Sequence, residues 1–277
     1  MLKYLHLLLK EKIIKDESKD FSSLLNIEIS VADGEKIREI EKTTNHDLKA
    51  IEIFLKEKLK KEGMSSMSVF VNFGVGSEDI NNVALRLQVK NSFNEVMLPA
   101  LVKLLSSLIN FIKPITNVAM LARTHGQPAS VTTLGKELGL YLDRIVCELD
   151  MLNSCKFHPK FSGEVGNFNT LSNTSPFDWR SFEQRFLKGL GFEKASFATQ
   201  IPPYDDLITF FDSWKRLNNV LAGFAKEIWL YASFNYLNLK QPQGEVGSSG
   251  MPHKINPQYF EGSEGGLEIA NALLEFF

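Results

Sequence analysis

Residues 245–257 (EVGSSGMPHKINP) bring together side chains that can move a proton or bind an anion. They combine the Ser248 hydroxyl, the Lys254 ammonium and the Asn256 amide with two glycines and two prolines. Glycine and proline are unfavourable inside helices and central strands, so the stretch is predicted to be a loop. Its backbone N–H groups, hydroxyl, cation and amide can together enclose a small anion.

Two histidines lie in polar stretches beside predicted helices. His46 stands in residues 43–50 (TTNHDLKA), where Thr44 and Asp47 have the spacing of a helix-capping box. This spacing predicts His46 in the first helical turn, where free N–H groups favour an anion. His125 stands in residues 122–129 (ARTHGQPA), and a histidine suits general acid or base work. From spacing alone, the simpler interpretation of His46 is a surface histidine near a helix cap. The simpler interpretation of residues 245–257 is a solvated connection between two helices.

The same residues argue against other kinds of chemistry. The chain has five histidines and two cysteines, Cys147 and Cys155, and none falls at a metal-binding spacing such as HxxxH or CxxC. No P-loop and no dinucleotide fingerprint follows a predicted strand. We therefore expect no catalytic metal, and an acid–base reaction such as proton abstraction next to a carboxylate.

The overall composition is that of a soluble globular protein. Apolar residues make up 44% and charged residues 23% of the chain, and the formal net charge is −2, which gives no electrostatic case for nucleic acid or membrane. The small number of cysteines fits a reducing, cytoplasmic setting. The apolar run in residues 1–17 is short, is interrupted by His6 and lacks a small-residue cleavage site. We interpret it as the end of a core helix.

Apolar residues at helical spacing predict an all-α fold. The predicted helices span residues 48–59, 80–112, 134–152, 179–190 and 206–237, with a kink or break at Pro99. Helices longer than about 25 residues need partners along their length, which implies a bundle shared between subunits. A small hairpin is predicted around Gly163 and Gly166. We predict a small N-terminal helical domain (1–66) and a long-helix bundle domain (67–277), incomplete at its C-terminal end.

The three polar stretches also match specific sequence motifs. Residues 247–256 (GSSGMPHKIN) resemble the signature GSSxMPxKxN of the fumarase/aspartase superfamily, whose members eliminate fumarate from succinyl-type substrates. Residues 43–50 and 122–129 narrow the resemblance to the adenylosuccinate lyase family, in its longer, bacterial-type branch. Three separated motifs in the right order argue against coincidence. The resemblance runs through nearly the whole chain and implies the long-helix bundle fold of that superfamily.

The resemblance implies a reaction and an assembly. Members of the family cleave adenylosuccinate to AMP and fumarate, and SAICAR to AICAR, the matching step on a carboxamide intermediate of purine synthesis. They use no metal and no organic cofactor. The resemblance further implies a cytoplasmic homotetramer that binds a purine nucleotide, with no nucleic acid or membrane partner. Each active site takes motifs from three subunits, which explains how loops at separate helix ends meet.

The resemblance also implies roles for individual residues. His125 is the general acid for the departing amine, and Ser248 is the base that removes the β-proton. An unperturbed hydroxyl is too weak a base, so Ser248 needs to be held as an oxyanion by a closed, cation-lined loop. Lys254 and Asn256 are placed to stabilise the doubly charged aci-carboxylate that elimination creates. Substrate contacts are implied for Asn45, His46, Asp47, Gly76, Ser77, Gln200, Lys254 and Asn256.

Two departures from the family keep alternatives open. Family members usually carry Thr-Ser where this chain has Gly76 and Ser77, so one substrate-binding hydroxyl is missing. The family's N-terminal Arg-Tyr motif and its C-terminal phosphate-binding residues are also absent from the sequence. One alternative is a truncated, catalytically impaired relative that serves as a helical assembly protein. Another is a fumarate-releasing lyase that acts on argininosuccinate or malate. The NHD and RTHGQP motifs argue against this alternative.

Overall fold

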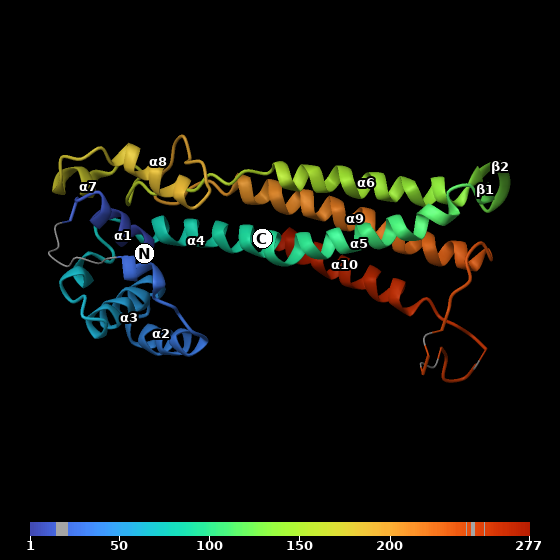
Figure 1. The fold of residues 1–277 in the computed structure, drawn as a ribbon, viewed down its shortest axis with the longest axis horizontal. Coiled ribbons are helices and arrows are strands. Elements are labelled where there is room, and N and C mark those ends of the chain that lie inside the picture. The colour runs from blue at the N-terminus through green and yellow to red at the C-terminus, as the bar shows by residue number, and fades with distance from the viewer. Residues whose placement is uncertain (15–21, 242, 245–246, 252) are drawn as a thin grey trace. The chain divides into compact units, whose positions relative to one another are not determined.

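The structure of this chain is a computed structural model that describes residues 1–14, 22–241, 243–244, 247–251 and 253–277. Glu245, Val246 and Pro252 of the predicted loop, and residues 15–17 of the apolar N-terminal run, lie outside the described residues. Helices make up most of the regular structure of the described chain, with one antiparallel pair of strands (Figure 1), so the prediction of an all-α fold is confirmed.

The described helices range from one short turn to a rod of 29 residues. They are α1 (Leu2–Lys10), α2 (Val31–Thr44), α3 (Asp47–Lys61), α4 (Ser77–Ser92), α5 (Leu98–Ile112), α6 (Leu134–Ser154), α7 (Asn169–Thr174), α8 (Trp179–Gly189), α9 (Asp205–Ser233) and α10 (Gln258–Phe276). Short 3-10 turns span Ser22–Asn26, Ser66–Phe70 and Lys113–Ile115, and the strands are β1 (Ala119–Thr124) and β2 (Gln127–Thr133). The helices predicted at 48–59, 134–152, 179–190 and 206–237 are confirmed as α3, α6, α8 and α9, whereas α10 was not predicted.

Residue contacts divide the chain into two compact units. The first unit contains Met1–Lys90 and Lys156–Pro203, and the second contains Asn91–Cys155 and Tyr204–Phe277. The predicted boundary near residue 66 does not coincide with an edge of either unit. The division into domains 1–66 and 67–277 therefore stays a prediction.

The core of the first unit is aromatic. Tyr4 of α1 is fully buried, and its ring lies 4.9 Å, 5.9 Å and 6.0 Å from the rings of Phe161, Phe182 and Phe186. Tilted and edge-to-face rings at these separations attract one another beyond the effect of burial alone. The Tyr4 hydroxyl donates to the Phe73 carbonyl at 2.7 Å, and burial raises the pKa of Tyr4. The apolar N-terminal run is thus a core helix, as predicted.

The hairpin predicted around Gly163 and Gly166 is wrong. The structure places no strand in residues 159–168, and both glycines have positive φ, 85° and 82°. The N–H groups of Ser162 and Gly163 donate to Asp79 Oδ1, at 3.0 Å and 3.2 Å, instead of to a neighbouring strand. The Gly-rich sequence correctly indicated turns, but a buried carboxylate of α4 supplies the acceptor that a second strand was expected to provide.

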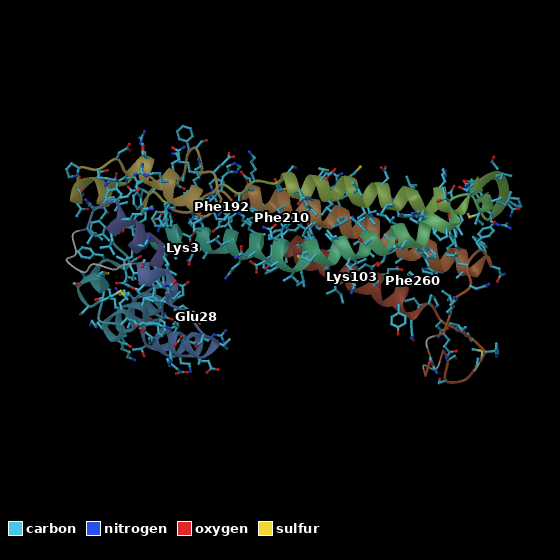
Figure 2. All side chains as sticks on the ribbon, in the orientation of Figure 1. Lys3, Glu28, Lys103, Phe192, Phe210 and Phe260 are labelled. Atoms are coloured by element: carbon cyan, nitrogen blue, oxygen red, sulfur yellow. The ribbon has the colours of Figure 1, made fainter. Side chains whose placement is uncertain are left out.

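The second unit is a bundle of long helices. Helix α9 packs on both α6 and α10, and α5 packs on α6 (Figure 1). The Phe93 ring stands nearly perpendicular to those of Phe210 and Trp214, with centroids 5.5 Å and 5.9 Å away. Figure 2 labels Phe210 on α9. Apolar side chains of α6, including Leu138 and Ile145, are fully buried against this core. The bundle carries loops at its helix ends, where the candidate catalytic residues of this unit lie.

The long apolar helix changes its hydrogen-bonding pattern before Pro99, and the kink or break predicted there stays a prediction. A π-helical turn, Phe93–Met97, separates α4 from α5, and Pro99 lies in the first turn of α5. Proline has no N–H to donate to the carbonyl of Glu95, and its ring crowds that turn, so a locally widened helix relieves both problems. By length and composition alone the described run Ser77–Ile115 is able to span a membrane. This is a weak indication, because core helices of soluble proteins meet the same criteria.

Candidate active site

His125 lies at the tip of the β1–β2 hairpin. Thr124 pairs with Gln127, and the two residues between them, His125 and Gly126, have φ values of 54° and 74°. Two successive positive φ angles define the tight turn whose twist matches that of paired strands. Histidine is among the side chains that tolerate this region. The turn therefore presents an exposed imidazole at the end of the bundle.

Arg123 and Tyr236 brace this turn. Arg123 Nη1 donates to the Gly126 carbonyl at 3.0 Å, across the turn. Arg123 Nε donates to the Tyr236 hydroxyl at 3.0 Å, and that hydroxyl donates to the Leu121 carbonyl at 2.7 Å. The guanidinium also lies 5.4 Å from the centre of the Phe234 ring. The segment that follows α9 is thus attached to the hairpin that carries the candidate acid.

Little in the sequence points to this brace. Arg123 belongs to the motif that includes His125, which was the one available signal. Tyr236 is 113 residues further along the chain, and nothing in its sequence context points to the hairpin.

The described part of the signature loop is closed at its base. Asn256 Nδ2 donates to the Gly247 carbonyl at 2.9 Å, and the Lys254 N–H donates to the Met251 carbonyl at 3.0 Å. A Cβ atom at Gly247 would lie 2.4 Å from the Lys254 carbonyl oxygen, so only glycine allows this approach. A cavity of about 280 Å³ beside the base is lined by Phe111, Ile228, Asn256 and their neighbours.

The catalytic side chains predicted on this loop differ in exposure. The Lys254 side chain is exposed and Ser248 is half-buried. Among the described residues, no hydrogen bond or ion pair joins His125 to Ser248, Lys254 or Asn256. The convergence of these groups on one substrate therefore stays a prediction.

His46 in the first unit caps a helix. The capping box predicted from Thr44 and Asp47 is wrong, because His46 is itself the N-cap of α3 and its Nδ1 accepts the Lys49 N–H at 3.4 Å. Thr44 ends α2, and its hydroxyl donates to the His46 carbonyl at 3.1 Å. Asn45 has a φ of 49°, which asparagine tolerates. The predicted contacts Asn45, His46 and Asp47 thus form an exposed, tight turn between two helices.

The other predicted substrate contacts of the first unit lie in two further segments. Gly76 immediately precedes α4 and Ser77 is its first residue. The Gly76 N–H donates to Asp79 Oδ2 at 2.8 Å, and the Asp79 N–H donates to the Gly76 carbonyl at 3.2 Å. Free N–H groups at such a helix start favour a negatively charged group. Gln200 is exposed in the irregular segment between α8 and α9.

Comparison with known proteins agrees with these motifs. A family model described as lyase matches residues 6–268. The chain is 43% identical over 256 residues to an adenylosuccinate lyase of Dictyostelium discoideum, and the aligned region covers 90% of this chain and 55% of that protein. It is 40% identical over 245 residues to the enzyme of that name from Haemophilus influenzae, covering 88% and 54%. The corresponding Escherichia coli K12 enzyme is 39% identical over 248 residues, covering 89% and 54%.

The chain spans about half the length of these curated relatives. The family model nevertheless matches most of the chain, including the turn with His46, the hairpin with His125 and the signature loop. The chain therefore belongs to this lyase family.

Proposed function

We propose that the protein is an adenylosuccinate lyase. It cleaves adenylosuccinate to AMP and fumarate, and SAICAR to AICAR and fumarate, in purine synthesis. The main support is the similarity along nearly the whole chain to enzymes of that name, at 40% identity for the Haemophilus influenzae protein. The NHD motif lies in an exposed turn and the RTHGQP motif in an exposed hairpin, where the imidazoles of His46 and His125 can meet a substrate.

The proposed reaction is a β-elimination with two proton transfers. Ser248, held as an oxyanion, removes a proton from the carbon next to a carboxylate, and the electron pair moves into that carboxylate. Lys254, Asn256 and loop N–H groups stabilise the resulting negative charge. The pair then forms the double bond of fumarate as the C–N bond breaks. His125 gives its proton to the departing nitrogen.

The remaining polar turns are proposed to hold the nucleotide. Their support is that each is exposed or half-buried and offers donors and acceptors rather than bulk. Ser77 lies at the start of α4, where the helix dipole favours an anionic group. The proposed contacts are Asn45, His46, Asp47, Gly76, Ser77 and Gln200.

The active protein is proposed to be a cytoplasmic homotetramer in which each site takes motifs from three subunits. Support comes from apolar side chains that the bundle leaves exposed, which favour association with further helices. These side chains on α5 and α10 are Val102, Ile109, Phe111, Ile269, Leu273 and Phe276. The proposal includes no metal, no organic cofactor, no nucleic acid and no membrane.

Fumarate release tests the proposed function directly. Full-length protein incubated with adenylosuccinate is expected to form fumarate and AMP in equal amounts, and SAICAR is expected to react as well. Argininosuccinate and malate are included to test for the related lyases. Release of fumarate from one of these alone would replace the proposed substrate. A folded protein that acts on none of them would favour a purely structural role.

A hydroxyl restored at position 76 is expected to improve substrate binding. A Cβ atom at Gly76 would meet Glu164 at 3.5 Å and Asp79 at 3.7 Å, which are ordinary contacts, so Gly76→Thr should fit. One additional hydrogen bond contributes about 0.5–1.5 kcal/mol, so KM should fall about 2–10-fold at unchanged kcat. The matched control is Gly76→Ala, which adds the Cβ without the hydroxyl. An equal effect of both variants would mean that the hydroxyl makes no substrate contact.

Loss of the Tyr236 hydroxyl is expected to loosen the turn that carries His125. Tyr236→Phe removes the acceptor of Arg123 Nε and the donor to the Leu121 carbonyl while keeping the ring. Two exposed hydrogen bonds of this kind suggest a loss of about 2–10-fold in kcat, with little change in melting temperature. Ser106→Ala, which removes an exposed hydroxyl on α5 in the same unit, serves as the control. Unchanged kcat in Tyr236→Phe would show that the brace does not affect catalysis.

A further inference from the structure

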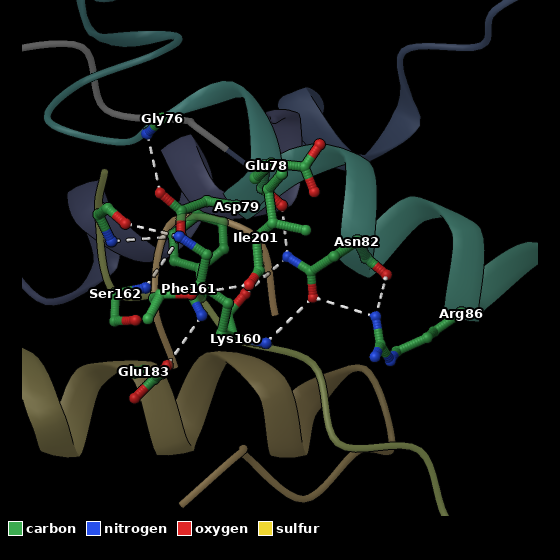
Figure 3. A network of polar contacts seen from close by, with 12 residues as sticks. Gly76, Glu78, Asp79, Asn82, Arg86, Lys160, Phe161, Ser162, Glu183 and Ile201 are labelled. Atoms are coloured by element: carbon green, nitrogen blue, oxygen red, sulfur yellow. Dashed lines mark hydrogen bonds and ion pairs between the residues drawn. The ribbon is translucent and has the colours of Figure 1, made fainter. Parts of the chain in front are cut away.

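A cluster of charged and amide side chains is buried in the first unit, where α4 begins (Figure 3). Asp79, Asn82 and Arg86 of α4 are fully buried, and Lys160 from the segment after α6 is 1% exposed. Lysine, arginine and aspartate are rarely buried to this degree unless they are paired. Their burial requires specific partners, and those partners turn out to be the backbone of two loops.

The Asp79 carboxylate joins two segments that are far apart in the sequence. Its Oδ2 accepts the Gly76 N–H at 2.8 Å. Its Oδ1 accepts the N–H groups of Ser162 at 3.0 Å and Gly163 at 3.2 Å, and lies 3.1 Å from Lys160 Nζ (Figure 3). One side chain therefore holds both the segment before α4 and the loop 160–166.

Lys160 and Asn82 hold the same loop through its backbone. Lys160 Nζ donates to the Gly163 carbonyl at 2.6 Å. The Asn82 side chain donates to the Lys160 carbonyl and accepts the Lys160 N–H, both at 3.0 Å. With Asp79, these contacts satisfy backbone groups of Lys160, Ser162 and Gly163 that have no partner in a helix or strand.

Arg86 extends the cluster to the segment that contains Gln200. Arg86 Nη1 donates to Asn82, and Nη2 donates to the Pro203 carbonyl at 2.9 Å. The loop 160–166 also packs on that segment, since a Cβ atom at Gly166 would lie only 2.1 Å from the Ala198 carbonyl oxygen. The segments before α4, around residue 163 and around residue 200 are thus connected through one buried cluster.

We propose that Asp79 and Lys160 are positioning residues for the substrate site. Their buried ion pair holds the segment that carries Gly76 and Ser77 to the loop 160–166. That loop in turn packs on the segment that carries Gln200. The inference rests on the proposed function, which assigns substrate contacts to those residues. Neither Asp79 nor Lys160 is exposed to a ligand, so they act through the loops rather than on the substrate.

The chemistry of the carboxylate makes this inference testable with an isosteric change. Ionised aspartate offers acceptors on both oxygens, and in this structure both are used by N–H groups. Asparagine offers one acceptor oxygen and one NH₂ group that only donates. In Asp79→Asn the NH₂ group therefore lies against a backbone N–H of one of the two loops, where no hydrogen bond can form. Asp79→Asn alone also leaves Lys160 as an unpaired buried charge, which is strongly destabilising. The double variant Asp79→Asn/Lys160→Met avoids that charge.

The test compares kinetics and stability of the full-length double variant. We expect KM for adenylosuccinate to rise by about tenfold or more, with kcat within about threefold, because misplaced loops weaken binding of substrate and transition state alike. Leu59→Ala in α3 is the matched control. Leu59 is fully buried in the same unit, so its loss lowers the melting temperature without touching the loops. Its KM is expected to stay at the wild-type value.

The outcomes separate this inference from the proposed function. Wild-type protein that releases no fumarate would refute the function itself. An active wild type with an unchanged KM in the double variant would overturn the positioning role, and so would an equal rise of KM in Leu59→Ala. Amide hydrogen exchange of the wild-type protein is a second test, and its result does not depend on whether a variant folds. The Gly76, Ser162 and Gly163 amides should exchange as slowly as those of α4, and exchange at exposed-loop rates would overturn the inference.

Discussion

Turnover of adenylosuccinate should fall by about 10²–10⁴-fold in the His125→Ala variant, because the departing nitrogen then has to leave without a positioned proton donor. The exposed place of His125 in a two-residue turn means that the substitution removes no core contact. The melting temperature and the oligomeric state should therefore match those of the wild type. Fumarate release under saturating substrate measures the effect.

His158→Ala is the control for this variant, because it also removes a partly exposed imidazole but carries no catalytic role in the proposal. Added imidazole should restore part of the activity of His125→Ala if a proton donor is what the enzyme lacks. Wild-type turnover in His125→Ala would remove His125 from the mechanism. A loss of turnover accompanied by dissociation of the oligomer would point to assembly instead of acid catalysis.

Lys254→Met is expected to lower kcat by about 10²–10³-fold, the usual effect of removing one donor that stabilises a developing anion. Methionine keeps much of the length of the lysine side chain and removes the charge. Because the ammonium is exposed and the loop base is closed by Asn256 and Gly247, the fold should persist. Single-turnover kinetics would show whether the chemical step is the one that slows.

Lys103→Met on α5 is a suitable control, since it removes an exposed ammonium from the same unit. Lys254→Arg should restore only part of the rate, because a guanidinium keeps the charge but not the compact shape of the ammonium. A rise in KM at unchanged kcat in Lys254→Met would mean that Lys254 binds the ground-state carboxylate without favouring the transition state.

The sequence predicted the long helices because their signal is local. Apolar residues recur about every 3.6 positions in each of them, and their ends coincide with glycine, proline or polar clusters. An irregularity at Pro99 was expected for the same local reason, since a proline removes a donor from any helix, but the π-helical turn that precedes it was not predicted. The motifs singled out His46, His125 and Ser248 as candidate residues, whereas the two strands that carry His125 at their turn were not predicted.

One prediction failed because a neighbouring side chain took the expected role, and another failed because a distant partner changed the local geometry. The spacing of Thr44 and Asp47 suggested a capping box, but the imidazole of His46 takes the capping position. Gly163 and Gly166 suggested a hairpin, but their loop is held by a carboxylate about eighty residues away. A sequence pattern records spacing along the chain and carries no information about such partners.

The sequence by itself determined the all-α class, the positions of most helices and the chemical groups available for an elimination reaction. Only the tertiary structure revealed that Asp79, Asn82, Arg86 and Lys160 form one buried cluster, and that Tyr236 braces the turn of His125. The physical reason is that helix formation follows from near neighbours, whereas burial of a charge is stable only when folding brings a distant counter-charge and backbone groups within hydrogen-bonding distance.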